Sequence, residues 1–288
     1  MVRKKYEAWL FLGPSLLGLV FMIYGPVAAV FGLGFTHYDV LRPAEWAGLS
    51  NYISIFSNPL FWKVLWNTVY FALGTGVVGI FFSLILAMLI NVDIPLQGIF
   101  RTIFFLPVVV SMVAASFIWR WMLNSHFGVF NYLLQTVGIA GPLWLDDPRW
   151  TMFGIIIMTL WKMVGYNMII FLAGLKNIPR EFYQAAQIDG AGWSTRLFRI
   201  TLPLLSPTTF FVIIVSLINA FLVFEQTYVI TNGGPANATL TFALHIFNNA
   251  FLYFKMGYAS ALAFLFFIII LLVTMIQIGL QKRWVYYD

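Results

Sequence analysis

The sequence contains no cysteine and very few charged residues. Its 288 residues are 61% hydrophobic and only 9% Asp, Glu, Lys and Arg. The absence of cysteine excludes disulfide bonds and any metal or redox chemistry that depends on thiols. The scarcity of charge excludes an ordinary soluble domain and is typical of a polytopic membrane protein.

The motifs of common enzymes are also absent. The sequence has no G-x-x-x-x-G-K-[ST] phosphate-binding loop, no H-E-x-x-H metal motif and no G-x-S-x-G nucleophile motif. The three histidines, His37, His126 and His245, lie far apart, so we expect no metal site from them. We therefore expect a chain that is not an enzyme and that binds no cofactor of its own.

Long hydrophobic runs dominate what is present. A transmembrane helix needs roughly 20 apolar residues, and lipid cannot hydrogen-bond to a free backbone. The sequence therefore predicts an all-α, polytopic membrane protein with a single transmembrane domain over 1–288. Its six spans are expected at about 9–35, 64–92, 102–123, 150–175, 205–228 and 256–281.

The first run has a second interpretation. Arg3, Lys4 and Lys5 precede it, as positive charges precede the apolar core of a signal peptide. The run is longer than such a core, and no small-x-small cleavage site follows it. We expect a retained first helix.

The positive charges predict the orientation in the membrane. Lys and Arg are enriched in cytoplasmic loops. With the N-terminus inside, the inner segments hold Arg3, Lys4, Lys5, Arg101, Lys176, Arg180, Arg196, Arg199, Lys282 and Arg283, and the outer ones hold Arg42, Lys63, Arg120, Arg149 and Lys255. We therefore expect both termini in the cytoplasm, and the net charge of +6 needs no nucleic acid to explain it.

One inner loop, 176–204, is long and has a helical pattern. Asp189-Gly190 is a turn signal that separates two short helical segments, and Pro203 ends the second. One interpretation is an interfacial amphipathic helix that lies on lipid headgroups. The other is a folded elbow that contacts a soluble partner.

Several short sequences in and around this loop match one family. Gln184, Ala185, Ala186, Asp189, Gly190, Ala191, Ile200, Leu202 and Pro203 occupy the places of E-A-A, D-G-A and I-x-L-P. The stretch 172–207 resembles the EAA loop of permeases from binding-protein-dependent ABC importers. Gln184 stands where the family usually has Glu, so the salt bridge of that carboxylate is replaced at most by an amide hydrogen bond.

Other sequences resemble the carbohydrate-uptake branch of these permeases. They are Thr231–Pro235 with the following residues to Thr239, Met256–Ala261, Asn51-Tyr52 and Asn67-Thr68. The similarity runs over nearly the whole chain, which lacks the extra N-terminal helices and the large outer insertion of the large maltose-transporter subunit. It is therefore closer to the compact six-helix members.

The resemblance implies a type I ABC importer permease fold in a bacterial or archaeal cell membrane. It also implies four kinds of partner: membrane lipid, a second permease subunit, two ATPase subunits that bind ATP and Mg, and an extracytoplasmic solute-binding protein. The chain would form half of the translocation pore. The resemblance assigns coupling to the ATPase to Gln184, Ala185, Ala186, Asp189, Gly190 and Ala191.

Lys162 is the only full charge well inside a predicted span. At 1.5 Å per residue it lies roughly 15 to 20 Å from either end of its helix, too deep to reach the interface fully. Intramembrane charges usually face a cavity or the protein interior. Lys162 is therefore either a functional group or a structural one, bonded to backbone carbonyls or to a carboxylate of a partner chain.

Polar side chains occur at comparable depth in the fourth and fifth spans. Ser216 and Asn219 form an i,i+3 pair, which lines a path or joins two helices by hydrogen bonds. By resemblance to the maltose-type subunit, the substrate path is expected along Thr159, Lys162, Met163, Tyr166, Ser216, Asn219, Ala220 and Val223. Several of these differ in type from the maltose pattern, which indicates that the sugar is recognised in a different way or that the site is transient. Glu225 ends the fifth span as a plain interfacial carboxylate, as an ion-pair partner of Lys255 or as a contact for the binding protein.

Two other function classes have weaker support. An ion-coupled secondary transporter would place carboxylates near mid-membrane, and none lies well inside any of the six spans. A membrane-embedded lipid-modifying enzyme would need catalytic pairs that the sequence does not show.

Overall fold

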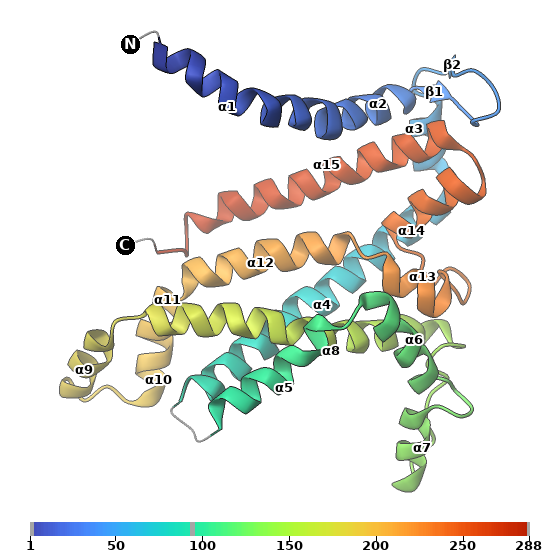
Figure 1. The fold of residues 1–288 in the computed structure, drawn as a ribbon. Helices are drawn as coiled ribbons and strands as arrows, with labels where there is room; N and C mark the ends of the chain where they lie inside the picture. Colours follow the sequence, from blue (N-terminus) through green and yellow to red (C-terminus); the bar gives the residue numbers. More distant parts are fainter. Residues whose placement is uncertain (1–2, 93–95, 287–288) are drawn as a thin grey trace. The chain divides into compact units, whose positions relative to one another are not determined.

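Helices form most of the structure, a computed structural model that describes residues 3–92 and 96–286. Figure 1 shows the path of the chain. The α-helices are α1 (Arg3–Leu19), α2 (Gly25–Leu33), α3 (Ser50–Ser57), α4 (Pro59–Asn91), α5 (Gln97–Val109), α6 (Met112–Met122), α7 (Val129–Thr136), α8 (Pro148–Asn177), α9 (Arg180–Ile188), α10 (Trp193–Arg196), α11 (Leu202–Leu204), α12 (Ser206–Phe221), α13 (Glu225–Thr231), α14 (Phe242–Phe247) and α15 (Met256–Gln281). Three π-helical segments, η1 (Val20–Tyr24), η2 (Leu197–Thr201) and η3 (Asn248–Leu252), continue neighbouring helices, and β1 (Thr36–His37) pairs with β2 (Glu45–Trp46).

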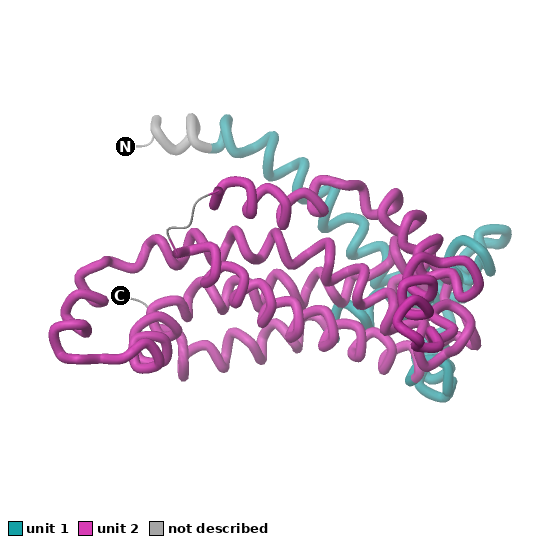
Figure 2. Tube along the Cα trace, turned by 90° about the horizontal axis from the view of Figure 1, so that it is seen from below, with its two compact units in different colours: residues 1–62, 245–269 teal, residues 63–244, 270–288 magenta. Residues whose placement is uncertain are grey.

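Contacts divide the chain into two compact units (Figure 2). The first comprises 1–62 and 245–269, and the second comprises 63–244 and 270–288. The expected single domain over 1–288 stays a prediction.

In the first unit, a short hairpin connects the first helix to the rest. β1 and β2 are antiparallel, and the buried amide of Asn51 donates hydrogen bonds of 2.9 Å to the carbonyls of Gly34 and Thr36. The backbone N–H of Gly257, at the start of α15, donates to Tyr38 O at 3.0 Å. The signatures at Asn51-Tyr52 and at 256–261 therefore meet on this hairpin.

The predicted spans agree with the structure at four places. Within the described residues, four helices are long and apolar enough to cross a membrane, at Trp9–Leu33, Pro59–Asn91, Pro148–Asn177 and Met256–Gln281. Two further pairs of helices pass the same test only if each bent pair is one span, which gives up to six. The chain is a multi-pass membrane protein by this measure.

The expected continuous span at 102–123 is wrong in detail. α5 already begins at Gln97, ends at Val109, and is followed by α6 at an angle of 96°. Pro107 has no N–H to continue the helical ladder, and Val110 and Ser111 adopt extended ψ angles of 137° and 139°. Of the expected inner loop 93–101, residues 93–95 lie outside the described residues.

The expected span at 205–228 is also interrupted. α12 ends at Phe221, and α13 begins at Glu225 after an irregular segment in which Phe224 has φ −140° and ψ −60°. A second bend, of 62°, separates Trp193–Leu204 from Ser206–Phe221. A side chain supplies a hydrogen bond to this irregular segment: Thr241 Oγ1 donates to the backbone carbonyl of Val223 at 3.0 Å. Irregular backbone at membrane depth is tolerated where it is buried in protein or lines a cavity.

The core of the second unit joins α4, α8 and α12. Its buried members are Ala87, Ile90, Met168, Phe171, Leu172, Leu175, Ile178, Leu205 and Val212. α5 packs closely on α8, because Gly165 leaves room for its backbone: a Cβ there would lie 1.9 Å from Phe104 O. This close approach brings the end of α5 next to the middle of α8.

Candidate functional site

A cavity of about 450 Å³ lies in the second unit among α4, α8, α12 and the irregular segment that follows α12. Six of the eight residues predicted for the substrate path line it: Thr159, Met163, Ser216, Asn219, Ala220 and Val223. Its other lining residues include Thr75, Met112, Asn167, Phe224, Glu225 and Gln226. A concave, mostly apolar cavity with a few convergent polar groups is the usual form of a small-molecule site.

Most polar side chains of the cavity are already hydrogen-bonded to the protein. Asn167 Nδ2 donates to Ser216 Oγ at 3.0 Å, and joins α8 to α12. Gln226 Nε2 donates to Thr159 Oγ1 at 3.4 Å, and Thr159 Oγ1 in turn donates to Ile155 O at 2.8 Å. Both interpretations of Ser216 therefore apply, since it lines the cavity and also joins two helices.

Lys162 is not among the cavity-lining residues. Its ammonium group donates to three carbonyl oxygens at the end of α5: Pro107 O and Val108 O at 3.2 Å each, and Val110 O at 2.5 Å. The last carbonyls of a helix lack intrahelical partners and carry the negative end of its dipole. This geometry matches the structural interpretation of Lys162, in which the buried lysine donates hydrogen bonds to backbone carbonyls.

Tyr166 also lies outside the cavity, with 40% of its surface exposed. Asn167, its neighbour, lines the cavity instead. Helical spacing was sufficient to find this residue, because Thr159, Met163 and Asn167 follow one another at i, i+4 and i+8 and so share a face. Glu225 and Gln226 lacked such a signal, because they reach the cavity only through the interruption after α12.

The signature after the fifth span is held against α4. Asn67 Nδ2 donates to Asn237 O at 2.8 Å and to Leu240 O at 3.0 Å, and Lys63 Nζ donates to Ala236 O at 2.7 Å. The backbone N–H of Phe242 donates to Thr68 Oγ1 at 3.0 Å. Asn67-Thr68 and the segment after Thr231–Pro235 are therefore one structural element, although they are about 170 residues apart.

The predicted coupling loop forms a folded elbow. α9 ends in a left-handed glycine, Gly190, at φ +73°. The N–H of Gly190 donates to Gln187 O at 3.1 Å, and the N–H of Ala191 donates to Ala186 O at 2.8 Å. This pair of bonds is the Schellman arrangement, which satisfies the last carbonyls of a helix.

The two arms of this elbow are also joined by side chains. Tyr183 Oη and Thr201 Oγ1 are 3.0 Å apart, so a hydrogen bond connects α9 to η2. Ala186 is buried, whereas Ile188 and Trp193 expose 87% and 70% of their surfaces. An elbow with a fixed interior and large exposed apolar side chains is suited to contact another surface.

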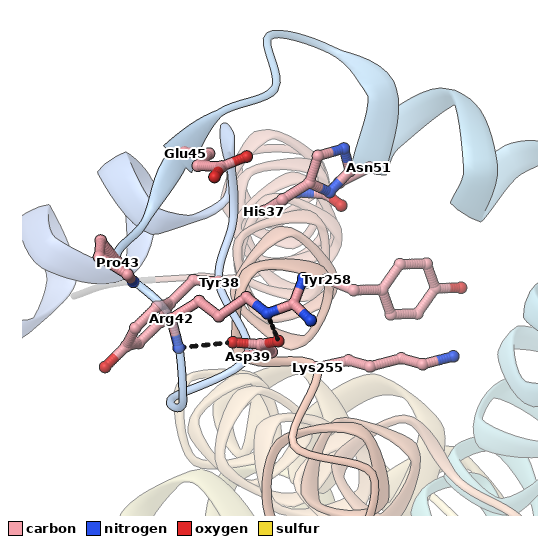
Figure 3. A pocket seen from close by; sticks show the side chains of 9 residues that line it. All are labelled: His37, Tyr38, Asp39, Arg42, Pro43, Glu45, Asn51, Lys255 and Tyr258. Carbon is pink, nitrogen blue, oxygen red and sulfur yellow. Dashed lines mark hydrogen bonds and ion pairs between the residues drawn. The ribbon is translucent and has the colours of Figure 1, made fainter.

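The first unit has a polar pocket of its own, of about 330 Å³, next to the β1–β2 hairpin. Figure 3 shows Arg42 paired with Asp39 (the guanidinium Nε lies 4.0 Å from Oδ2), while Lys255 and Tyr258 extend away from this pair. Tyr52 follows the lining residue Asn51 in the chain, and its hydroxyl is buried without a hydrogen-bond partner among the described residues. Burial raises the pKa of Tyr52 above its usual value.

These features define a class of protein: a polytopic membrane component with a solute-sized cavity and an exposed folded elbow. Residues 49–286 match the family described as the inner membrane component of binding-protein-dependent transport systems. The chain belongs to this family, and is thus a permease subunit of an ABC transporter rather than the subunit that hydrolyses ATP.

Curated relatives span the chain almost completely. It is 36% identical to a probable ABC transporter permease protein, YesP, of Bacillus subtilis (strain 168), over 100% of this chain and 94% of the relative. It is 35% identical to the sulfoquinovosyl glycerol transport permease SmoG of Agrobacterium fabrum, over 96% and 90%. It is 37% identical to the lactose transport permease LacF of Rhizobium radiobacter, over 96% and 95%.

A solved structure has the same fold. A chain of a bacterial ABC transporter involved in import of the acidic polysaccharide alginate superposes with a TM-score of 0.85, at 22% identity, over 98% of this chain and 97% of that one. The expected type I importer permease fold is confirmed.

Proposed function

We propose that this chain forms half of the translocation pore of an ATP-driven importer for a sugar or sugar-like solute. The observation that carries the proposal is the convergence of six predicted path residues on one cavity in a chain of the permease family. Relatives named for lactose, for sulfoquinovosyl glycerol and for arabinooligosaccharides support a carbohydrate as the solute.

We propose that the elbow at 180–204 is the surface that contacts the ATPase and transmits its motion. Its candidate contacts are Gln184, Ala185, Ala186, Asp189, Gly190 and Ala191. The closed turn at Gly190 and the Tyr183–Thr201 bond support this role, because an element transmits a displacement only if its own packing does not yield.

The proposed partners are a second permease subunit, two ATPase subunits that hold ATP and Mg, and an external solute-binding protein. In this arrangement both termini and the elbow face the cytoplasm. A structure of the alginate transporter in complex with an alginate-bound periplasmic protein supports the last partner by analogy of fold. We assign contact with the binding protein to the hairpin pocket, whose Asp39, Arg42 and Lys255 offer charges of both signs.

The test is uptake by the complete transporter. The chain is co-expressed with its partner permease and ATPase, reconstituted in liposomes, and given the binding protein with labelled lactose, trehalose or arabinooligosaccharides. We expect accumulation that requires ATP. Transport that proceeds without the ATPase and collapses with the ion gradient would instead identify a secondary transporter.

A substitution in the cavity tests the path itself. We expect Asn219→Leu to reduce uptake at least about tenfold while assembly with the partners is unchanged, because it removes an exposed amide from the cavity. Phe211→Leu, at an exposed position of the same helix outside the lining set, is the control. Normal uptake by Asn219→Leu would reject the path.

A further inference from the structure

The polar groups of the cavity fall into two sets. Thr75, Thr159, Asn167, Ser216 and Gln226 each take part in hydrogen bonds within the protein. Asn219 and Glu225 are exposed in the cavity, and their side chains form no hydrogen bond or ion pair among the residues that the structure describes. Asn219 and Glu225 are therefore the cavity side chains of which no polar atom is engaged within the described residues.

The charge of the cavity has one sign. Glu225 is the only ionisable residue among its described lining residues, and no Lys, Arg or His lines it. A carboxylate accepts hydrogen bonds from hydroxyl groups and repels other anions. Asn219, less than two helical turns before Glu225 in the chain, adds a donor and an acceptor without charge.

The nearby intramembrane cation, Lys162, keeps its charge but is held in place by hydrogen bonds, so it does not move to pair with a solute. An ammonium group has three N–H donors, and those of Lys162 face three carbonyl acceptors at the end of α5. If an anionic solute drew Lys162 away, the buried carbonyls at the break would lose their partner. Lys162 and Glu225 form no ion pair, since within the described residues the ion pair is that of Arg42 with Asp39.

We propose that the cavity takes uncharged polyhydroxylated solutes and that Glu225 is the residue that excludes their anionic counterparts. This inference rests on the proposed function, since it names the chemical class of the solute for the same cavity. In this proposal Asn219 and Glu225 bind the hydroxyl groups of the solute.

Because the chain contains no cysteine, the electrostatic field in the cavity can be tested with a single introduced thiol, without knowledge of the solute. Asn219→Cys places a single thiol in the cavity of the assembled transporter. Its rates of modification by a cationic and an anionic methanethiosulfonate reagent of similar size are followed by the mass of this chain. The ratio of the two rates is divided by the ratio at Gln135→Cys, an exposed position outside the cavity.

We expect the cationic reagent to be favoured at position 219, and the added substitution Glu225→Gln to lower the ratio by about tenfold. Asp146→Asn, which neutralises an exposed carboxylate outside the cavity, is the matched control and should leave the ratio unchanged. Glu225→Gln keeps the shape of the side chain, and co-purification with the partner subunits verifies its assembly.

The outcomes separate the two proposals. A ratio that Glu225→Gln does not change, or one that favours the anionic reagent from the start, overturns the role of Glu225 whether or not uptake occurs. Loss of ATP-dependent saccharide uptake by the unmodified transporter overturns the proposed function instead. A shifted ratio together with ATP-dependent uptake of a neutral saccharide supports both.

Discussion

Helices end abruptly at two places in the second unit, after α5 and after α9, and their last carbonyls find partners in different ways. After α9, the N–H groups of Gly190 and Ala191 come from the next residues of the chain. After α5, the N–H of Val110 donates to Pro107 O, and the carbonyls of Pro107, Val108 and Val110 accept from the ammonium group of Lys162, which comes from α8 more than 50 residues later. A turn in a connecting loop can be local, whereas a break inside a membrane depends on a distant side chain.

The largest effect is expected from removing that distant donor. Lys162→Met leaves the carbonyls of Pro107, Val108 and Val110 without the ammonium, and we expect a loss of about 2–4 kcal/mol of stability. Thermal inactivation of the purified complex, followed by size-exclusion chromatography, measures it. Lys162→Arg retains N–H donors and should recover part of the loss.

A methionine variant as stable as the unmodified protein would show that the break needs no donor from α8. It would then resemble the turn after α9, and the contrast between the two regions would fail.

A somewhat smaller effect is expected where α5 approaches α8. Gly165→Ala places a Cβ against the backbone of Phe104, which cannot move without shifting α5, and we expect a cost of about 1–3 kcal/mol. Gly98→Ala, also on α5, meets nothing within 4 Å and should be neutral or slightly stabilising. Equal melting temperatures for the two variants would refute the close packing of α5 on α8, which brings Lys162 within hydrogen-bond distance of the carbonyls at the end of α5.

The turn after α9 should respond through the backbone alone. A Cβ at Gly190 meets nothing within 4 Å, but the residue has φ +73°, so Gly190→Ala costs about 1–2 kcal/mol of local stability. We expect reduced stimulation of the ATPase by loaded binding protein, with membrane insertion unchanged. Gly192→Ala is the matched control, because Gly192 has φ −69° and equally open surroundings. If loaded binding protein stimulates the ATPase equally in both variants, the left-handed turn has no role in coupling.

The difference between the two regions also explains what the sequence could predict. The elbow is recognisable because its signals are local: Asp189-Gly190 marks the turn, and helical spacing marks both arms. The long apolar runs at 59–91, 148–177 and 256–281 were equally visible, because length and hydropathy define them.

The interrupted spans were not predictable from local pattern. Pro107 lies in an apolar run that reads as one continuous helix, and the segment after Phe221 has no Gly or Pro to mark its break. The carbonyls of the first interruption accept from Lys162, more than 50 residues away, and Val223 O in the second accepts from Thr241, 18 residues later. Glu225 reaches the cavity only because of the second interruption, so its position there needed the tertiary structure.

The smallest effect is expected from the bond that joins the arms of the elbow. Tyr183→Phe removes the hydroxyl that lies 3.0 Å from Thr201 Oγ1, and we expect a loss of about 0.5–1.5 kcal/mol confined to the elbow. Hydrogen exchange should speed up at the amides of α10 and η2 but not in the core around Phe171. Tyr132→Phe, at a position with 67% of its surface exposed, is the matched control. Unchanged exchange in α10 and η2 would mean that the bond between Tyr183 and Thr201 does not stabilise the elbow. The local Schellman turn alone would then fix it.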